Sequence, residues 1–386
     1  IPLMKKVGYR PHFAAAVEAA ASTGGQLMPP VMGAGAFIMA QWTGISYIKI
    51  ISVAMIPAIM YFVSVAFFVH IEALKQGILP IPKKDLPRLR NVLKEGIQFT
   101  IPIIILIVLL VRGFTPTYAA CVGIGCVVVV SWFKKDTRMG IKDIIDALYI
   151  GARNTISTAA ILICTGIIIG VVAITGVAIT FSGVVLELSG GVLFLAIILV
   201  MLASLVLGMG LPVTASYIML AVLAGPALTQ MGISLLAAHM IIFWYSQDAN
   251  VTPPVCLAAF SAAGVAGSKP MQTGFTAWKL AKGLYIIPFL FAYTPLLFEG
   301  PVIEVAITAI SALIGLYGFT VSWEGYLLRR INIGERAIIA FATILLFWPV
   351  NLFKGLGFVI LAAMYLSQRA QLKETAHETP QVSRSL

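Results

Sequence analysis

The sequence predicts an all-α polytopic membrane protein with two re-entrant helical hairpins and broken helices. The first observation is composition, because 60% of the 386 residues are apolar and 11% are charged, whereas roughly 25% of the residues in a soluble domain are charged. The second is a series of apolar runs that approach or reach the length of a membrane crossing, about 20 residues. The third is a polar, proline-doubled interruption that occurs twice, at the only two Pro-Pro pairs in the sequence.

Apolar runs between polar or basic segments define the predicted spans. The final run is long enough for a hairpin broken near Pro349, since proline removes a backbone donor and disfavours helix at the residue before it. The predicted spans are residues 45–69, 99–111, 116–133, 159–177, 192–207, 284–298, 302–321 and 337–366.

The net charge of +11 is distributed over the connections between spans and does not form one stripe, which argues against nucleic-acid binding. This distribution is typical of the excess of lysine and arginine in cytoplasmic loops. We therefore expect two basic connections on the cytoplasmic side. They contain Lys75, Lys83, Lys84, Arg88, Arg90 and Lys94, and then Lys134, Lys135, Arg138 and Lys142.

The stretches ASTGGQLMPPV, at residues 21–31, and YSQDANVTPPV, at residues 245–255, indicate an internal repeat. After a slip of six positions the match continues, and a predicted span with one proline, Pro57 or Pro288, follows each copy. At a constant offset of 224 positions, Ser22 matches Ser246, Pro29 and Pro30 match Pro253 and Pro254, Val31 matches Val255 and Ala34 matches Ala258.

Each Pro-Pro pair predicts the tip of a re-entrant hairpin. In the first copy the arms, residues 11–21 and 31–40, are about half the length of a crossing. Unpaired backbone at membrane depth is tolerated only where it is buried in protein or lines a wet cavity. Oxygen atoms at such tips are suited to a desolvated sodium ion. The first tip offers Ser22, Thr23, Gly24, Gly25 and Gln26, and the second offers Ser246, Gln247, Asp248, Ala249, Asn250 and Thr252, followed by Pro253.

A third interruption, LGMGLPVTASY, lies at residues 207–217 within a long apolar run. Gly208 and Gly210 weaken the helix and Pro212 breaks it, while Thr214 and Ser216 offer hydroxyl oxygens. Broken helices in repeated halves are the best sequence indication of a secondary transporter's binding site. The repeat partner of this break would precede Ile1, so we expect the start of the first repeat to lie upstream.

The remaining polar groups inside apolar segments leave alternatives open. Asp248 is suited to ligate a cation, whereas Glu18 has no acidic counterpart and is as consistent with a neighbouring partner as with transport. His239 favours a hydrogen-bonded packing role. The four cysteines lie in apolar runs without metal-ligand spacing and are interpreted as packing residues.

Three strings, at residues 4–40, 208–217 and 248–264, together resemble the large membrane subunit of tripartite ATP-independent periplasmic (TRAP) transporters. The closest variant is the DctM-like, fused permease of four plus twelve helices that uses TAXI-type binding proteins. The resemblance covers residues 1–298 and implies an inverted-repeat, elevator-type fold. In this sequence Cys256 stands where many members have glycine.

The resemblance implies a sodium-driven importer of an organic acid in the bacterial or archaeal inner membrane. Its partners would be a periplasmic TAXI-type solute-binding protein and a small membrane subunit, fused upstream. Sodium would be the coupling ion and no other cofactor is implied. The sodium and substrate sites would then be formed by Ser22, Thr23, Gly24 and Gly25, by Gly208, Gly210, Pro212 and Thr214, and by Asp248, Asn250, Thr252 and Pro253.

The predicted organisation follows from these assignments. We expect the chain alone not to transport, because part of one repeat and a scaffold partner would be missing. The segments are 1–70, the first hairpin and its following helix; 71–96, a basic amphipathic connection; 97–150, scaffold helices and a basic loop; 151–300, the second repeat; 301–370, a C-terminal transmembrane extension; and 371–386, a disordered tail.

Two other classes of protein are weighed against this one. A sodium and divalent-anion symporter of related architecture would need no binding protein. An intramembrane enzyme would need a nucleophile with a base, paired aspartates or a metal cluster. The four histidines, His12, His70, His239 and His377, are scattered, so the sequence does not favour an enzyme.

Overall fold

The computed structural model describes residues 1–79 and 96–378, and these residues form helices with one isolated β-bridge, Tyr326 to Arg330. Four of their helices are long and apolar enough to cross a membrane: α4 (Tyr47–Gln76), α8 (Ile141–Thr175), α11 (Val213–Gln230) and α16 (Val302–Glu324). The prediction of an all-α polytopic membrane protein is confirmed.

The chain divides into two compact units. Unit 1 comprises Ile1–Met28, Val53–Leu79 and Gln247–Leu386, and unit 2 comprises Pro29–Ser52 and Pro80–Ser246. Two of the divisions fall within the predicted hairpin tips, after Met28 and after Ser246. The two arms of each predicted hairpin therefore belong to different units.

Unit 1 is built around α2, which packs against α13 and α14. Proline occupies the first turn of α2, where no backbone donor is needed. A capping box between Asn332 and Glu335 starts α17. Besides parts of α4, the unit contains α1 (Pro2–Val7), α2 (Pro11–Gly25), η4 (Asp248–Asn250), α13 (Leu257–Ala266), α14 (Pro270–Leu280), α15 (Gly283–Tyr293), η5 (Pro295–Leu297), α16, α17 (Ile333–Phe347) and α18 (Asn351–Glu378).

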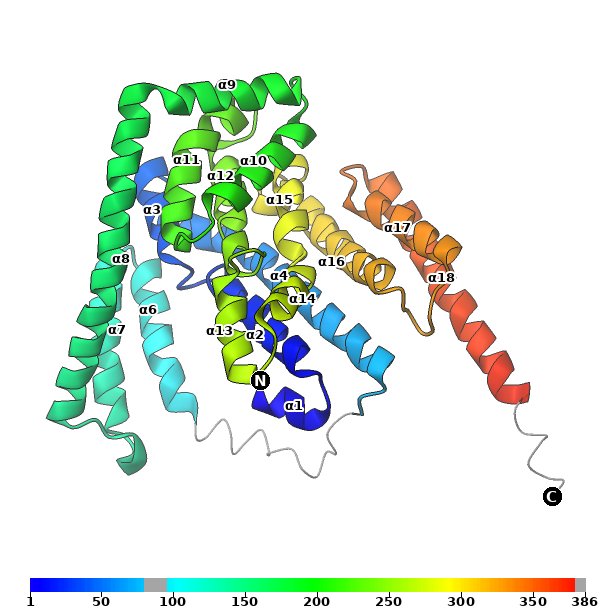
Figure 1. The fold of residues 1–386 in the computed structure, drawn as a ribbon, viewed down its shortest axis with the longest axis horizontal. Coiled ribbons are helices and arrows are strands. Elements are labelled where there is room, and N and C mark those ends of the chain that lie inside the picture. Colours follow the sequence, from blue (N-terminus) through cyan, green and yellow to red (C-terminus); the bar gives the residue numbers. More distant parts are fainter. Residues whose placement is uncertain (80–95, 379–386) are drawn as a thin grey trace. The chain divides into compact units, whose positions relative to one another are not determined.

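Unit 2 is built around α11, which packs against α3, α9, α10 and α12. The long helix α8 turns sharply into α9 at Gly176, whose φ of 71° is in the left-handed region that favours glycine (Figure 1). The other elements are α3 (Ala34–Thr43), η2 (Ile97–Thr100), α6 (Ile101–Val111), α7 (Pro116–Ser131), η3 (Lys135–Thr137), α9 (Val177–Ser189), α10 (Leu193–Leu207) and α12 (Leu235–Tyr245).

The hairpin arms pack in the pattern that a two-fold repeat requires. In the repeat, α2 corresponds to α12 and α3 corresponds to α13. Within unit 1, α2 packs against α13, and within unit 2, α3 packs against α12. The first arm of each copy therefore packs on the second arm of the other copy.

Most predicted spans coincide with helices, and the hairpin predicted near Pro349 is confirmed by the end of α17 at Phe347 and the start of α18 at Asn351. Three boundaries differ. Helix α8 begins at Ile141, well before the predicted span. Helix α4 includes residues 71–76 of the predicted basic connection, and α18 includes residues 371–378 of the predicted disordered tail. The rest of both segments, 80–95 and 379–386, lies outside the described residues.

The C-terminal extension, helices α16 to α18, is joined to the rest of unit 1 through a buried carboxylate. The side chain of Glu324, at the end of α16, is 2% exposed and lies 2.7 Å from Lys75 of α4 and 2.5 Å from Lys279 of α14. The ring of Tyr317 packs edge-on against Phe67 at 5.1 Å. One carboxylate therefore neutralises lysines from the helices that follow both hairpins.

We expect Glu324→Gln to destabilise the protein, because it leaves two lysines facing a neutral amide. Removing one partner of a buried ion pair costs about 3–5 kcal/mol, and the lower figure applies here since both lysines are partly exposed. The thermal unfolding midpoint in detergent measures the effect. Glu187→Gln, at an exposed carboxylate in α9, is the matched control, and an equal midpoint for both variants would contradict the bridging role.

Candidate functional site

The predicted residues of the first tip lie in a helix. Ser22, Thr23, Gly24 and Gly25 form the last turn of α2, and the chain leaves the helix only after Gly25. The first arm is therefore longer than predicted, because the prediction ended it at residue 21 and placed these residues in the tip. The backbone N–H groups of Gln26 and Leu27 donate to the carbonyl oxygens of Thr23 and Gly24, so two of the carbonyls expected to be free are occupied.

The side chains of this turn differ in what they can bind. The Ser22 hydroxyl is exposed and donates to Glu18 at 3.2 Å, which gives Glu18 a local partner. Thr23 is 2% exposed, and its hydroxyl has no hydrogen-bond partner among the described residues. Because a buried polar group without a partner is costly, most of all in lipid, Thr23 is the hydroxyl of this tip best placed for a ligand.

The second tip is more deeply buried. Asp248 is fully buried within η4, Thr252 is buried and Asn250 is half-buried. The backbone N–H of Thr252 donates to the carbonyl of Asp248 at 2.8 Å, which folds the tip into a tight turn. The hydroxyls of Thr252 and Tyr285 are hydrogen-bonded at 2.5 Å. Asp248 and Thr252 therefore present their polar groups inside unit 1.

Two tyrosines connect the tips within unit 1. The hydroxyl of Tyr61, in α4, donates to the carbonyl of Ala20 in α2 at 2.8 Å. Tyr285, in α15, is close enough to Asp248 and to Tyr61 for electrostatic interaction. A line of interacting groups therefore runs from the end of α2 through Tyr61 and Tyr285 to the second tip.

The sequence analysis did not single out these tyrosines. A weak signal was present, because Tyr61 and Tyr285 lie within one helical turn of Pro57 and Pro288, which follow the two hairpins. Tyrosine has an apolar ring and a polar hydroxyl, so a tyrosine inside a span often indicates a buried group that accepts a hydrogen bond. The group that accepts the hydrogen bond from each tyrosine could be identified only from the tertiary structure.

The ring of Tyr61 is held between two glycines. A Cβ added to Gly24 would lie 2.5 Å from the ring atom Cε1, and one added to Gly283 would lie 3.2 Å from Cδ2. With its hydroxyl bonded to Ala20 and its surface fully buried, the ring has little room to move. Gly24 is therefore required for close approach.

The broken helix is confirmed in unit 2. Helix α10 ends at Leu207 and α11 begins at Val213, with Gly210 in the left-handed region at φ 78° and Pro212 extended before α11. Thr214, in the first turn of α11, is half-buried. Ser216 is 0% exposed, and its hydroxyl has no hydrogen-bond partner among the residues that the structure describes.

Tyr47 and His239, also in unit 2, are both hydrogen-bonded. The hydroxyl of Tyr47 donates to the carbonyls of Pro30 and Val31 at 2.8 and 2.9 Å. His239 forms a hydrogen bond with the hydroxyl of Tyr217 through Nδ1 at 2.8 Å, which confirms its predicted packing role.

The two Pro-Pro segments share their backbone geometry. The peptide bonds Pro29–Pro30 and Pro253–Pro254 are both cis. Met32 and Cys256, which are related by the repeat offset, both have positive φ angles, 51° and 22°. Cys256 therefore adopts a conformation in which glycine is favoured, and the same conformation recurs with methionine in the first copy.

The arrangement in unit 1 is suited to a small hard cation. It contains a buried hydroxyl from Thr23 and a buried carboxylate from Asp248, and the backbone N–H of Thr252 donates to the backbone carbonyl of Asp248. Oxygen atoms are the ligands preferred by hard cations. In unit 2, the α11 N-terminus presents backbone N–H groups that favour an anion, and the buried Ser216 hydroxyl lies in that first turn.

Comparison with known families gives one match. The family model described as "Tripartite ATP-independent periplasmic transporter, DctM component" matches residues 1–299. The curated proteins contain no match to the chain. The family match ends just before α16, so helices α16, α17 and α18 lie beyond it.

We expect Gly24→Ala to disrupt the first tip while Gly25→Ala does not. The new methyl group at position 24 would overlap the immobile Tyr61 ring, whereas a Cβ at position 25 meets no atom within 4 Å. Overpacking typically costs about 1–3 kcal/mol. Thermal unfolding in detergent should show a lower midpoint for Gly24→Ala alone, and equal midpoints would refute the close approach. The double variant with Tyr61→Leu should recover part of the loss.

Proposed function

The chain belongs to the DctM component family of tripartite ATP-independent periplasmic transporters, and from this premise we propose that it imports an organic acid by sodium-coupled transport. The family is one of secondary transporters, and the protein is a large, multi-pass membrane subunit of such a system. A periplasmic binding protein and a small membrane subunit are the partners that this family implies. We propose that the binding protein is of the TAXI type and that the membrane is the inner membrane.

The observation that supports sodium coupling is the buried Thr23 hydroxyl without a hydrogen-bond partner among the described residues, in the same compact unit as the buried carboxylate of Asp248. A buried hydroxyl without a partner is unfavourable in a bilayer, and a buried carboxylate there is functional by default. In this proposal sodium binds both groups, since it carries one positive charge and takes oxygen ligands. Thr252 would be the third ligand, held in place by Tyr285.

The other unit supports the proposed substrate class. An organic acid carries a carboxylate, and the N-terminus of α11 combines partial positive charge with the buried hydroxyl of Ser216. In this proposal Thr214 and the backbone of Gly208 and Gly210 complete the binding site for the acid. We propose that the import step is an elevator motion, in which the segments that form both hairpins move against a scaffold.

We expect Thr252→Ala and Asn250→Ala to weaken sodium dependence. Loss of one oxygen ligand from a charged group is worth about 1.5–3 kcal/mol, which corresponds to roughly a tenfold or greater rise in the sodium concentration for half-maximal uptake. The measurement is uptake of radiolabelled mono- and dicarboxylates into proteoliposomes, with the complete permease and its binding protein. Thr155→Ala, at an exposed threonine of α8, is the matched control.

Thr23→Val provides a second, sharper variant, because it removes the hydroxyl and keeps the shape. Without sodium it should unfold at an equal or higher temperature than the wild type, since the unpaired polar atom is gone. With sodium it should gain less thermal stability than the wild type does. An unchanged sodium response in all three variants would refute the site. Uptake without the binding protein would instead indicate the symporter class.

A further inference from the structure

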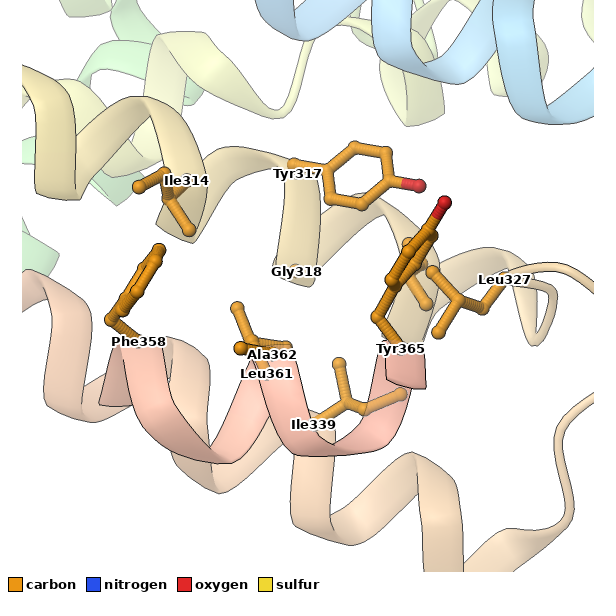
Figure 2. Close-up of a pocket in the computed structure, with 10 residues that line it drawn as sticks. Ile314, Tyr317, Gly318, Leu327, Ile339, Phe358, Leu361, Ala362 and Tyr365 are labelled. Atoms are coloured by element: carbon orange, nitrogen blue, oxygen red, sulfur yellow. The ribbon is translucent and has the colours of Figure 1, made fainter. Parts of the chain in front are cut away.

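The C-terminal extension contains an apolar groove that the transport function does not use. It has a volume of about 180 Å³ and lies among α16, α17 and α18, beyond the residues that the family model matches. Ile314, Tyr317, Leu327, Ile339, Phe358 and Tyr365 are among the lining residues (Figure 2). Phe358 is 52% exposed, so the groove is open to the surroundings of the protein.

The groove has one polar end. Figure 2 shows the hydroxyl groups of Tyr317 and Tyr365 together at one end, near Leu327, and Ile314 and Phe358 at the other. The remaining lining is apolar. A ligand that fits would therefore have a long apolar part and a polar head at the tyrosine end.

A basic turn closes the polar end. Residues 325–331 form a tight turn in which the N–H of Leu328 donates to the Gln368 side chain of α18 at 3.3 Å. Arg329 also reaches α18, by donating to Gln371 at 2.8 Å. These bonds place Arg330 at the same end as Arg369, which follows Gln368 and lies one helical turn beyond Tyr365.

The charges at this end are not balanced. Arg329 is neutralised by Glu335 at 2.7 Å. The side chains of Arg330 and Arg369 are exposed, and among the described residues neither has a carboxylate within ion-pair distance. Two guanidinium groups are thus available to a phosphate, which arginine binds with bidentate geometry.

We propose that this groove binds one acyl chain of an anionic phospholipid, with the headgroup held by Arg330 and Arg369. Basic residues at one end of a membrane helix favour the cytoplasmic side, where anionic lipids attract them. An apolar cavity of about 150 Å³ is known to hold a benzene-sized ligand, so the groove is large enough for a segment of a chain. The lipid would stabilise the packing of the extension.

The test uses the full chain in detergent, stripped of native lipid, and native mass spectrometry with dioleoyl-phosphatidylglycerol or dioleoyl-phosphatidylcholine. The wild type should retain dioleoyl-phosphatidylglycerol, the anionic lipid, in preference to dioleoyl-phosphatidylcholine. In the double variant Arg330→Gln with Arg369→Gln, the ratio of retained anionic to zwitterionic lipid should fall about tenfold or more. Each basic residue near the surface contributes about 1 kcal/mol to the binding of an anionic lipid. Arg138→Gln with Lys142→Gln, which changes two exposed cations in unit 2, should lose none.

A second pair of variants tests the acyl chain. Ala362 lines the groove, whereas its neighbour Ala363 is exposed and does not appear in the lining. Ala362→Phe should fill the groove and reduce lipid retention several-fold, and Ala363→Phe should leave it unchanged. Circular dichroism and gel filtration check that each variant folds. Equal retention of both lipids by the wild type overturns the proposal, as does an equal effect of the two phenylalanines.

Discussion

The structure depends on one constraint, that a polar atom inside a bilayer must find its partner within the protein. A helix interrupted at membrane depth exposes carbonyl and amide groups that water cannot reach. Tyr47 meets this need by donating to the carbonyls of Pro30 and Val31 in the first interruption, while Tyr61 donates to the Ala20 carbonyl within α2 and Tyr285 pairs with the Thr252 hydroxyl in the second. The buried hydroxyls of Thr23 and Ser216 have no hydrogen-bond partner among the described residues, and in the proposed function they are the groups that bind cargo.

The repeat explains how half-length helices are supported. An arm of ten to fifteen residues is too short to be stable as an isolated helix, and it needs a packing partner of matching length. Exchange of partners between copies supplies one, because α2 packs on α13 and α3 packs on α12 within their units. Small residues make the contacts close, as Gly24 and Gly283 do on either side of the Tyr61 ring.

The extension after residue 299 is attached by charge as well as by apolar packing. Glu324 joins lysines of α4 and α14, which are the helices that follow the two hairpins. The same end of the extension carries the basic turn and the polar end of the apolar groove. A bound lipid would therefore act on helices that are themselves connected to both copies of the repeat. If the proposed lipid binds, the lipid composition of the membrane affects the stability of unit 1.

The sequence by itself indicated four of the places where helices break, although Pro57, Pro226 and Pro288 lie inside helices. Pro29, Pro212, Pro253 and Pro349 each coincide with an interruption, because the loss of an N–H and the clash with the preceding turn act within a few residues. Only the tertiary structure decided which oxygens face inward. Ser22 and Thr23 are adjacent on α2, yet one is exposed and the other is buried, and Gly24 of the same turn lies against the ring of Tyr61, which is distant in sequence. Such choices depend on packing between distant segments, which no local rule contains.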